Sequence, residues 1–192
     1  MLIEFIDFVD SVLPSVDPDF RDGAKNAILQ FERTGEQLKY TTLSPLGELS
    51  QGDIISKVPS VFFDDNGDER TFSADALVLT TSCHIDNKDK IVLVPVLPLE
   101  SFQGDMASLQ KNTIFDFMYI PDAILSDKFI SFEYLNTYSK NLIFNGINAG
   151  KIKRVSSLNN LGYYFFVVKL SVFFMKIEDV ETLKKRNAGF AY

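Results

Sequence analysis

The chain has 192 residues, of which 46% are hydrophobic, and its formal net charge is −7. This length and apolar content suit one compact domain, and the negative charge works against non-specific binding to nucleic acid. The single cysteine excludes an intramolecular disulfide and a cysteine-rich zinc site, and it suits a reducing cytoplasm.

The first 40 residues predict a helical extension. Residues 4–13 have apolar side chains at helical spacing, and Pro14 ends the pattern. Acidic residues in this stretch argue against a signal peptide, which would begin with a basic region. A second helix starts at Asp17-Pro18, with Asp17 as its N-cap, and fades near Gly35. We expect both helices to pack on the core; an interaction arm is the alternative.

From residue 49 the pattern changes to strands. Residues 53–63 predict a strand that Pro59 bends or confines to an edge. The acidic loop that follows contains Asn66-Gly67, a strong signal for a hairpin turn. Residues 74–83 and 91–99 are apolar and β-branched on both faces, which predicts two central, buried strands joined by a polar turn. Two further strands are predicted within residues 114–121 and 128–143.

The C-terminal part combines strand-forming residues with helical spacing. We interpret residues 157–177 as one buried helix, because apolar side chains surround it on all sides, and residues 178–185 as its extension or a short separate helix. Lys169 interrupts the apolar run, which falls short of the roughly 20 residues that a membrane span needs. The sequence thus predicts one compact cytoplasmic domain with three parts: a helical extension (1–40), a strand-rich body with its helix (49–177) and a tail (178–192).

Three short motifs mark the predicted strands: Gly52-Asp53-Ile54, Ala76-Leu77-Val78 and Val94-Pro95-Val96. Their order resembles the opening strands of the MazF/PemK-like toxin barrels. A closer resemblance is to a bacterial and phage group with the same core, whose "QTCD"-like turn and "FFMR"-like helix end correspond to Thr81–His84 and Phe173–Lys176. The resemblance spans roughly residues 49–177. It implies an α+β fold, a small SH3-like antiparallel β-barrel with N-terminal helices and a buried C-terminal helix.

The departures from the toxin pattern concern the ribonuclease site. MazF-like ribonucleases are similar to one another in an arginine just before the "ALV" strand and a threonine or serine just after the "VPV" strand. Here Ala74-Asp75 and Leu97-Pro98 stand at these places, and an aspartate cannot stabilise charge on a scissile phosphate. We therefore expect a non-catalytic or degenerate member, acting as a binding or accessory protein in a bacterial or phage toxin–antitoxin or defence system. A ribonuclease toxin with a relocated site, in which Arg70 substitutes, is a weaker alternative.

The sharpest local feature is Cys83-His84, the only cysteine and the only histidine of the chain. A nucleophilic or redox centre would need His84 as the base and Asp86 to orient it. Neighbours on an extended strand point to opposite faces, so the pair needs a turn between its members. The favoured interpretation is a buried cysteine that acts as a small apolar residue, with His84 exposed on the turn.

Two charged segments complete the candidate sites. The acidic turn, Asp64 to Glu69, begins like a calcium loop but lacks its glutamate at the twelfth position, so a solvated hairpin turn is favoured. Lys151, Lys153 and Arg154 form a basic patch that could contact nucleic acid with Arg70, although a solvated loop is the more common role of three such charges. No cofactor and no metal is expected. A protein partner or a homodimer is expected, with nucleic acid possible and no membrane.

Overall fold

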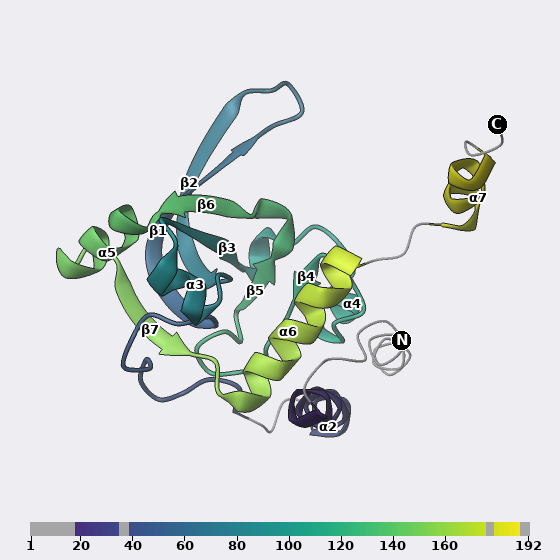
Figure 1. Cartoon of the computed structure of the whole chain (residues 1–192), viewed down its shortest axis with the longest axis horizontal. Coiled ribbons are helices and arrows are strands. Elements are labelled where there is room, and N and C mark those ends of the chain that lie inside the picture. Colours follow the sequence, from purple (N-terminus) through teal and green to yellow (C-terminus); the bar gives the residue numbers. More distant parts are fainter. Residues whose placement is uncertain (1–17, 35–38, 176–178, 189–192) are drawn as a thin grey trace.

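A computed structural model describes residues 18–34, 39–175 and 179–188 of the chain, which form a mixed α+β fold (Figure 1). The strands are β1 (Asp53–Phe63), β2 (Glu69–Val78), β3 (Lys90–Pro98), β4 (Phe117–Met118), β5 (Lys128–Ser131), β6 (Asn136–Ser139) and β7 (Lys153–Ser157). The α-helices are α2 (Pro18–Thr34), α3 (Ser82–Asn87), α4 (Met106–Gln110), α5 (Lys140–Asn148), α6 (Asn160–Met175) and α7 (Val180–Ala188). The predicted α+β class is confirmed.

The seven strands form one antiparallel sheet in the order β4-β5-β3-β2-β1-β7, with β6 also paired to β3. The first half of β3 pairs with β6 and its last residues pair with β5, so β3 lies at the centre of the sheet. The hydrogen-bonded path ends at β4 and β7, and no pairing between these two strands closes it into a barrel. The predicted central positions of β2 and β3 are confirmed, because β2 pairs with β1 and β3.

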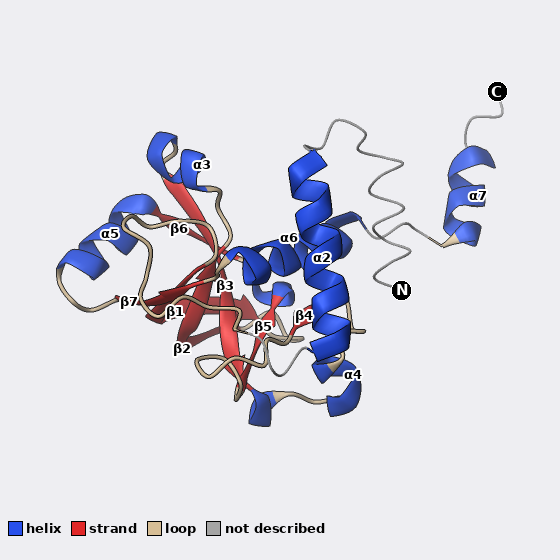
Figure 2. Cartoon of the chain, turned by 90° about the horizontal axis from the view of Figure 1, so that it is seen from below, coloured by secondary structure: helices blue, strands red, loops and turns tan. Residues whose placement is uncertain are grey.

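The centre of the sheet is buried on both faces, as the apolar runs of residues 74–83 and 91–99 predicted. Side chains alternate between two hydrophobic clusters: Ile54 and Leu77 belong to the larger cluster, and Ile55 and Val78 to the smaller one. The larger cluster contains the apolar faces of α2 and α6, and the smaller one contains residues of α3 and α5. Figure 2 shows these two pairs of helices at different ends of the sheet.

The predicted second helix and the predicted buried C-terminal helix are both confirmed, as α2 and α6. The two helices pack on each other, with the rings of Phe31 and Phe165 stacked at 4.5 Å between centroids. Gly162 allows α6 to lie close to the backbone of Tyr40. A Cβ at position 162 would lie 2.3 Å from the carbonyl oxygen of Tyr40, which is backbone and cannot move aside cheaply. The N-cap predicted at Asp17 and the helix predicted over residues 4–13 lie outside the described residues.

One strand prediction is wrong in detail, and two elements were not predicted. The segment 128–143 is not one strand, because a 3-10 turn at Phe132–Tyr134 separates β5 from β6 and shifts their register on β3. Its last residues begin α5, a helix that the sequence pattern did not predict. Strand β7 was also missed, because its five residues carry only one large apolar side chain and follow a glycine-containing loop.

The C-terminal helices bear on the expectation that no segment spans a membrane. Within the described ranges, no single helix is both long and apolar enough to cross a bilayer. Only α6 and Val180–Arg186 taken together reach that length and composition, and these two helices are bent by 51° at their break.

Candidate functional site

The residue pair Cys83-His84 lies on helix α3 and not at the end of a strand. The chain leaves β2 at Val78, and Thr81 serves as the N-cap of α3 with extended backbone angles. Ile85 is the buried residue of this helix, whereas Cys83, His84 and Asp86 are all exposed. The prediction of a buried, merely apolar Cys83 is therefore wrong, and the predicted polar turn is a short helix.

The side chains of this helix do not assemble a catalytic triad. The Sγ atom of Cys83 lies 3.5 Å from the hydroxyl of Thr81, and the Asp86 carbonyl accepts a hydrogen bond from Lys140. Successive residues of a helix point about 100° apart, so His84 does not face its neighbour. No hydrogen bond or ion pair among the described residues joins the three side chains, and a nucleophile needs its base within hydrogen-bond reach. The arrangement presents an exposed thiol without an assembled base.

A hydrogen-bond network around Gln51 connects the start of α3 with the end of β2 and with α6. The backbone N–H of Gln51 donates to the hydroxyl of Ser82 at 3.3 Å, and its side-chain amide donates to the carbonyl of Leu79 at 2.8 Å. The hydroxyl of Tyr163 on α6 donates to Oε1 of Gln51 at 3.0 Å. Burial raises the pKa of Tyr163, so its hydroxyl keeps the proton that this hydrogen bond uses. The "QGD" turn, the end of β2 and the start of α6 are thus tied together beside Cys83.

Arg154, predicted to contact nucleic acid, has an internal role instead. Its guanidinium binds the Asp53 carboxylate at 2.7 Å, and Asp53 is completely buried. The same guanidinium donates to the backbone carbonyls of the loop at Leu46, Gly47 and Glu48. The carboxylate is also bound by the hydroxyl of Ser157. Because its donors are engaged with the protein, Arg154 is a structural residue. Lys151 and Lys153 are exposed, and their contact with nucleic acid stays a prediction.

Arg70 lies beside the acidic turn, far along the β1/β2 hairpin. Its guanidinium binds Asp64 at 2.8 Å and lies 3.6 Å from Asp68. The hydrogen bond from Arg70 is the main reason why the pKa of Asp64 is lowered, with the backbone N–H of Asp68 contributing next. Gly67 has a φ of +82°, which favours glycine there and confirms the predicted turn. No group of three or more metal-ligating side chains is present in the described part of the chain.

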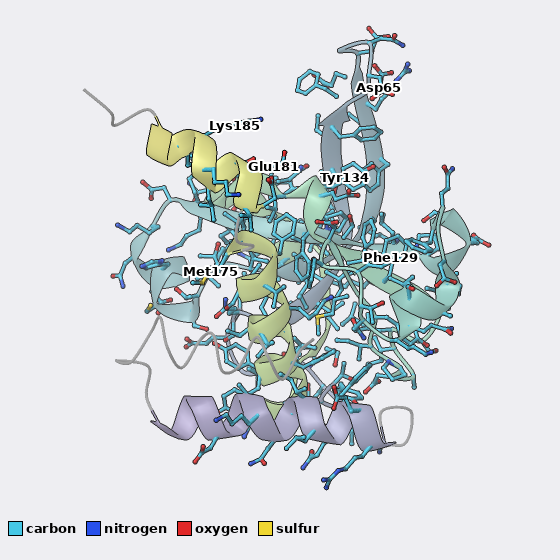
Figure 3. The ribbon with its side chains drawn as sticks, turned by 90° about the vertical axis from the view of Figure 1, so that its right-hand side faces the viewer. Asp65, Phe129, Tyr134, Met175, Glu181 and Lys185 are labelled. Atoms are coloured by element: carbon cyan, nitrogen blue, oxygen red, sulfur yellow. The ribbon has the colours of Figure 1, made fainter. Side chains whose placement is uncertain are left out.

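The sequence did not indicate that the far half of this hairpin projects from the body. Figure 1 shows β1 and β2 extending together beyond the other strands, and Figure 3 shows Asp65 at their tip with Tyr134 nearer the base. We call residues 59–73 the hairpin arm. Strand β7 pairs with β1 only up to Ser56, and β3 pairs with β2 only from Asp75 onward, so neither strand flanks the arm.

The hairpin arm carries apolar side chains on both faces. On one face the rings of Phe62, Phe72 and Tyr134 form a cluster with centroids 5.3 to 6.3 Å apart. On the other face Phe63 is 69% exposed and Val61 is 38% exposed. The large apolar residues at position 58 and at positions 61–63 were a visible signal, but a strand buried on both faces produces the same kind of apolar run.

Lys169, which interrupts the apolar run of α6, is a second feature whose role the sequence did not reveal. It is 1% exposed, and its Nζ donates to the backbone carbonyls of Asn112 at 3.1 Å and Ile114 at 2.5 Å. Burial lowers its pKa to about 8, opposed by the attraction of Asp116. The ammonium group therefore anchors the loop before β4 to α6, at the cost of a charged group removed from water.

Comparisons with known proteins add nothing to the resemblance to MazF/PemK-like barrels, which rests on its three short motifs alone. Neither a scan of protein-family models nor a search of curated proteins finds a match to this chain.

Proposed function

We propose that the chain is a non-catalytic accessory protein that binds a partner protein, built on a MazF/PemK-like, SH3-like arrangement of strands. In support of the fold, the motif Gly52-Asp53-Ile54 lies at the start of β1, and the motifs Ala76-Leu77-Val78 and Val94-Pro95-Val96 lie within β2 and β3, its neighbours in the antiparallel sheet. The resemblance is also the only support for a place in a bacterial or phage toxin–antitoxin or defence system.

One observation carries the binding function: the hairpin arm projects from the body and exposes Phe63. A phenylalanine that is 69% exposed contributes little to the stability of the chain itself, and large exposed apolar side chains mark interaction sites when they are grouped. Val61 lies two residues away on the same face. Aromatic residues on a projecting element are the kind of side chain that dominates the energetics of protein interfaces.

A photo-crosslinking experiment tests this function. We would produce Phe63→p-benzoylphenylalanine in cells that carry the native gene neighbourhood, irradiate them and identify adducts by mass spectrometry. The matched control is the same substitution at Leu142, which is 50% exposed on α5. We expect a defined protein adduct at position 63 and none at position 142. Equal adducts at both positions, or none at either, would contradict a binding role for the hairpin arm.

The competing ribonuclease function has its own test. Purified full-length chain would be incubated with single-stranded RNA, together with Arg70→Ala and Cys83→Ala. We expect no cleavage that depends on either residue, because the Arg70 guanidinium is bound to Asp64 and the thiol lacks an assembled base. Cleavage that either substitution abolishes would show that the chain is an enzyme and that the accessory role is wrong.

A second candidate function, thiol chemistry at Cys83 with His84 and Asp86, is favoured by the exposure of the thiol. The test is the rate at which iodoacetamide alkylates Cys83 at neutral pH, compared with free cysteine and with His84→Gln. A reactive site would accelerate alkylation and lose the acceleration in His84→Gln, since a nucleophilic cysteine depends on its base. An alkylation rate that His84→Gln leaves unchanged would contradict this second function.

A further inference from the structure

The two edges of the hairpin arm differ in how their backbone groups are satisfied. In an antiparallel pair, residues alternate between those that bond to the opposite strand and those whose N–H and C=O point outward. The backbone N–H and C=O of Val61 point outward, away from β2. The N–H donates to Oδ1 of Asn136 at 2.7 Å, and the carbonyl accepts from Nδ2 of Asn136 at 3.0 Å. The amide of Asn136 thus takes the place that a neighbouring strand would occupy.

The β1 edge is closed at Pro59 as well, the next outward position toward the body; Phe63, opposite Glu69 beside the turn, is the third outward position on this edge. Pro59 has no N–H to offer, and its carbonyl accepts a hydrogen bond from the hydroxyl of Tyr138 at 2.7 Å. Just before it, Lys57 has a φ of +60° at the place where the register of β1 shifts against β2. Prolines, bulges and covering side chains are the devices by which proteins protect a sheet edge from pairing with another chain.

The β2 edge of the hairpin arm has none of these devices. Val61 lies opposite Thr71 in the register, so the backbone groups of Thr71 also point outward, on the other side of the ribbon. The same alternation directs Glu69 and Ser73 outward. All three residues are exposed, and no strand other than β1 pairs with β2 before Asp75. No hydrogen bond among the described residues reaches these outward groups.

The charges around the open edge select a class of occupant. The turn and the start of β2 hold four carboxylates, those of Asp64, Asp65, Asp68 and Glu69, against the single guanidinium of Arg70. Asp64 already binds Arg70, which leaves Asp65 and Glu69 exposed without a basic partner on the arm. Phe63 and Phe72 stand on either side of this charged stretch in the sequence and lie on opposite faces of the arm. A strand laid beside β2 would be complementary if it carried basic and apolar side chains.

We propose that the open edge, Glu69 to Ser73, accepts an extended segment of a partner protein that is rich in basic and apolar residues, as an additional strand beside β2. This proposal rests on the proposed binding function and names the surface and the chemistry of the partner. The outward N–H and C=O groups of Thr71 supply the central hydrogen bonds. The carboxylates near the tip provide the preference for a basic segment.

The test uses the full-length chain, labelled with nitrogen-15, and two synthetic peptides of alternating sequence, acetyl-(Lys-Val)3-amide and acetyl-(Glu-Val)3-amide. Backbone amide shifts are followed during titration. We expect the basic peptide to shift the amides of Glu69, Thr71 and Ser73 and to bind at least about tenfold more tightly than the acidic peptide. Shifts elsewhere only, or no shifts, would overturn the proposal.

Thr71→Pro removes the outward N–H while leaving every hydrogen bond between β1 and β2 in place, as a proline at an edge position does. Thr71→Val is the matched control, because it keeps the N–H. We expect Thr71→Pro to weaken the basic peptide at least about tenfold and Thr71→Val to leave it unchanged. If Thr71→Pro fails to fold, the double substitution Asp68→Lys and Glu69→Lys decides instead. It should reverse the preference between the two peptides, and an unchanged preference would overturn the proposal.

Three other outcomes would lead to different conclusions. Concentration-dependent dimerisation that Thr71→Pro abolishes would make a second copy of this chain the occupant and overturn the proposed partner class. A protein adduct at position 63 without any strand addition at Thr71 would leave the proposed binding function standing while this proposal fails. Conversely, RNA cleavage that depends on Cys83 would remove the binding function and the partner segment with it.

Discussion

The β1/β2 hairpin contains two regions in opposite environments. At its base, residues 53–58 and 74–78 are flanked by β7 and β3, and Ile54 is only 1% exposed. In the hairpin arm, the strands continue with no flanking strand, and Phe63 is 69% exposed. The neighbours, and not the strand-forming tendency of the residues, decide which half belongs to the core. Stability should therefore be concentrated in the base, and binding in the arm.

The largest expected effect is at the base, where Arg154→Met removes the partner of the buried Asp53 carboxylate. Breaking a buried ion pair by removing one member leaves an uncompensated charge, which costs roughly 3–5 kcal/mol of unfolding free energy. The loop carbonyls at Leu46 and Glu48 lose a donor at the same time. Urea unfolding measures the loss. The matched control is Lys153→Met on the same strand, where the side chain is exposed and a change within about 0.5 kcal/mol is expected. Equal effects of the two substitutions would show that the ion pair does not stabilise the base.

The next effect is the pH dependence that Lys169 gives to the body. Its pKa is about 8 in the folded chain and 10.5 in its ordinary state, so the folded protein binds fewer protons between these values. Stability from this group therefore rises as the pH increases through that window. The gain between about pH 7 and pH 9.5 is about 2 kcal/mol.

Lys169→Met isolates this contribution, because the substitution removes the titrating group and leaves the other lysines and tyrosines in place. The difference in unfolding free energy between the two proteins, measured in urea at both pH values, should shift in favour of the native chain at the higher pH. Ionisation of the buried Tyr40 affects the unfolding free energy only at higher pH, since burial raises its pKa to about 12. A constant difference would mean that Lys169 is not desolvated in solution.

Features that depend on neighbouring residues could be predicted from the sequence, and features that depend on distant residues could not. The β1/β2 hairpin was predictable because Asn66-Gly67 is a turn signal between two apolar runs, and α2 was predictable from its periodicity. Helix α6 was predictable from the length and helical spacing of a segment that is apolar on all sides. The pairing of Asp53 with Arg154 was not, because 101 residues separate them and neither stands in a motif that announces the other. Arg154 therefore looked like part of a basic patch.

The candidate site shows the same limit. The exposure of Cys83 depends on whether the chain continues as a strand or turns into a helix after Thr81, and "TTSCHID" permits both. The open edge of β2 was equally invisible, because it results from where β3 stops pairing with β2. Edges are properties of a sheet and not of a strand's own residues.

A smaller effect is expected where base and arm meet, at Asn136. Asn136→Ala removes both hydrogen bonds to Val61 and should reduce the unfolding free energy by about 1 kcal/mol, since these groups can be solvated by water. The substitution also opens the β1 edge at that position. Hydrogen exchange should show faster exchange of the Val61 amide, while the amides at Ile54 and Leu77 keep their protection. Loss of protection in the base as well would show that the two regions unfold together.

The smallest effect on stability is expected at Phe63, whose substitution compares the arm directly with the base of the same strand. Phe63→Ser should change the unfolding free energy by no more than about 0.5 kcal/mol, because the ring is already largely in water. Ile54→Ala, in the same strand, should cost roughly 2–5 kcal/mol, because it leaves a cavity in the core. Urea unfolding of both variants makes the comparison directly. A large loss from Phe63→Ser would mean that the ring is buried within the chain in solution, and its exposure would then no longer argue for a partner.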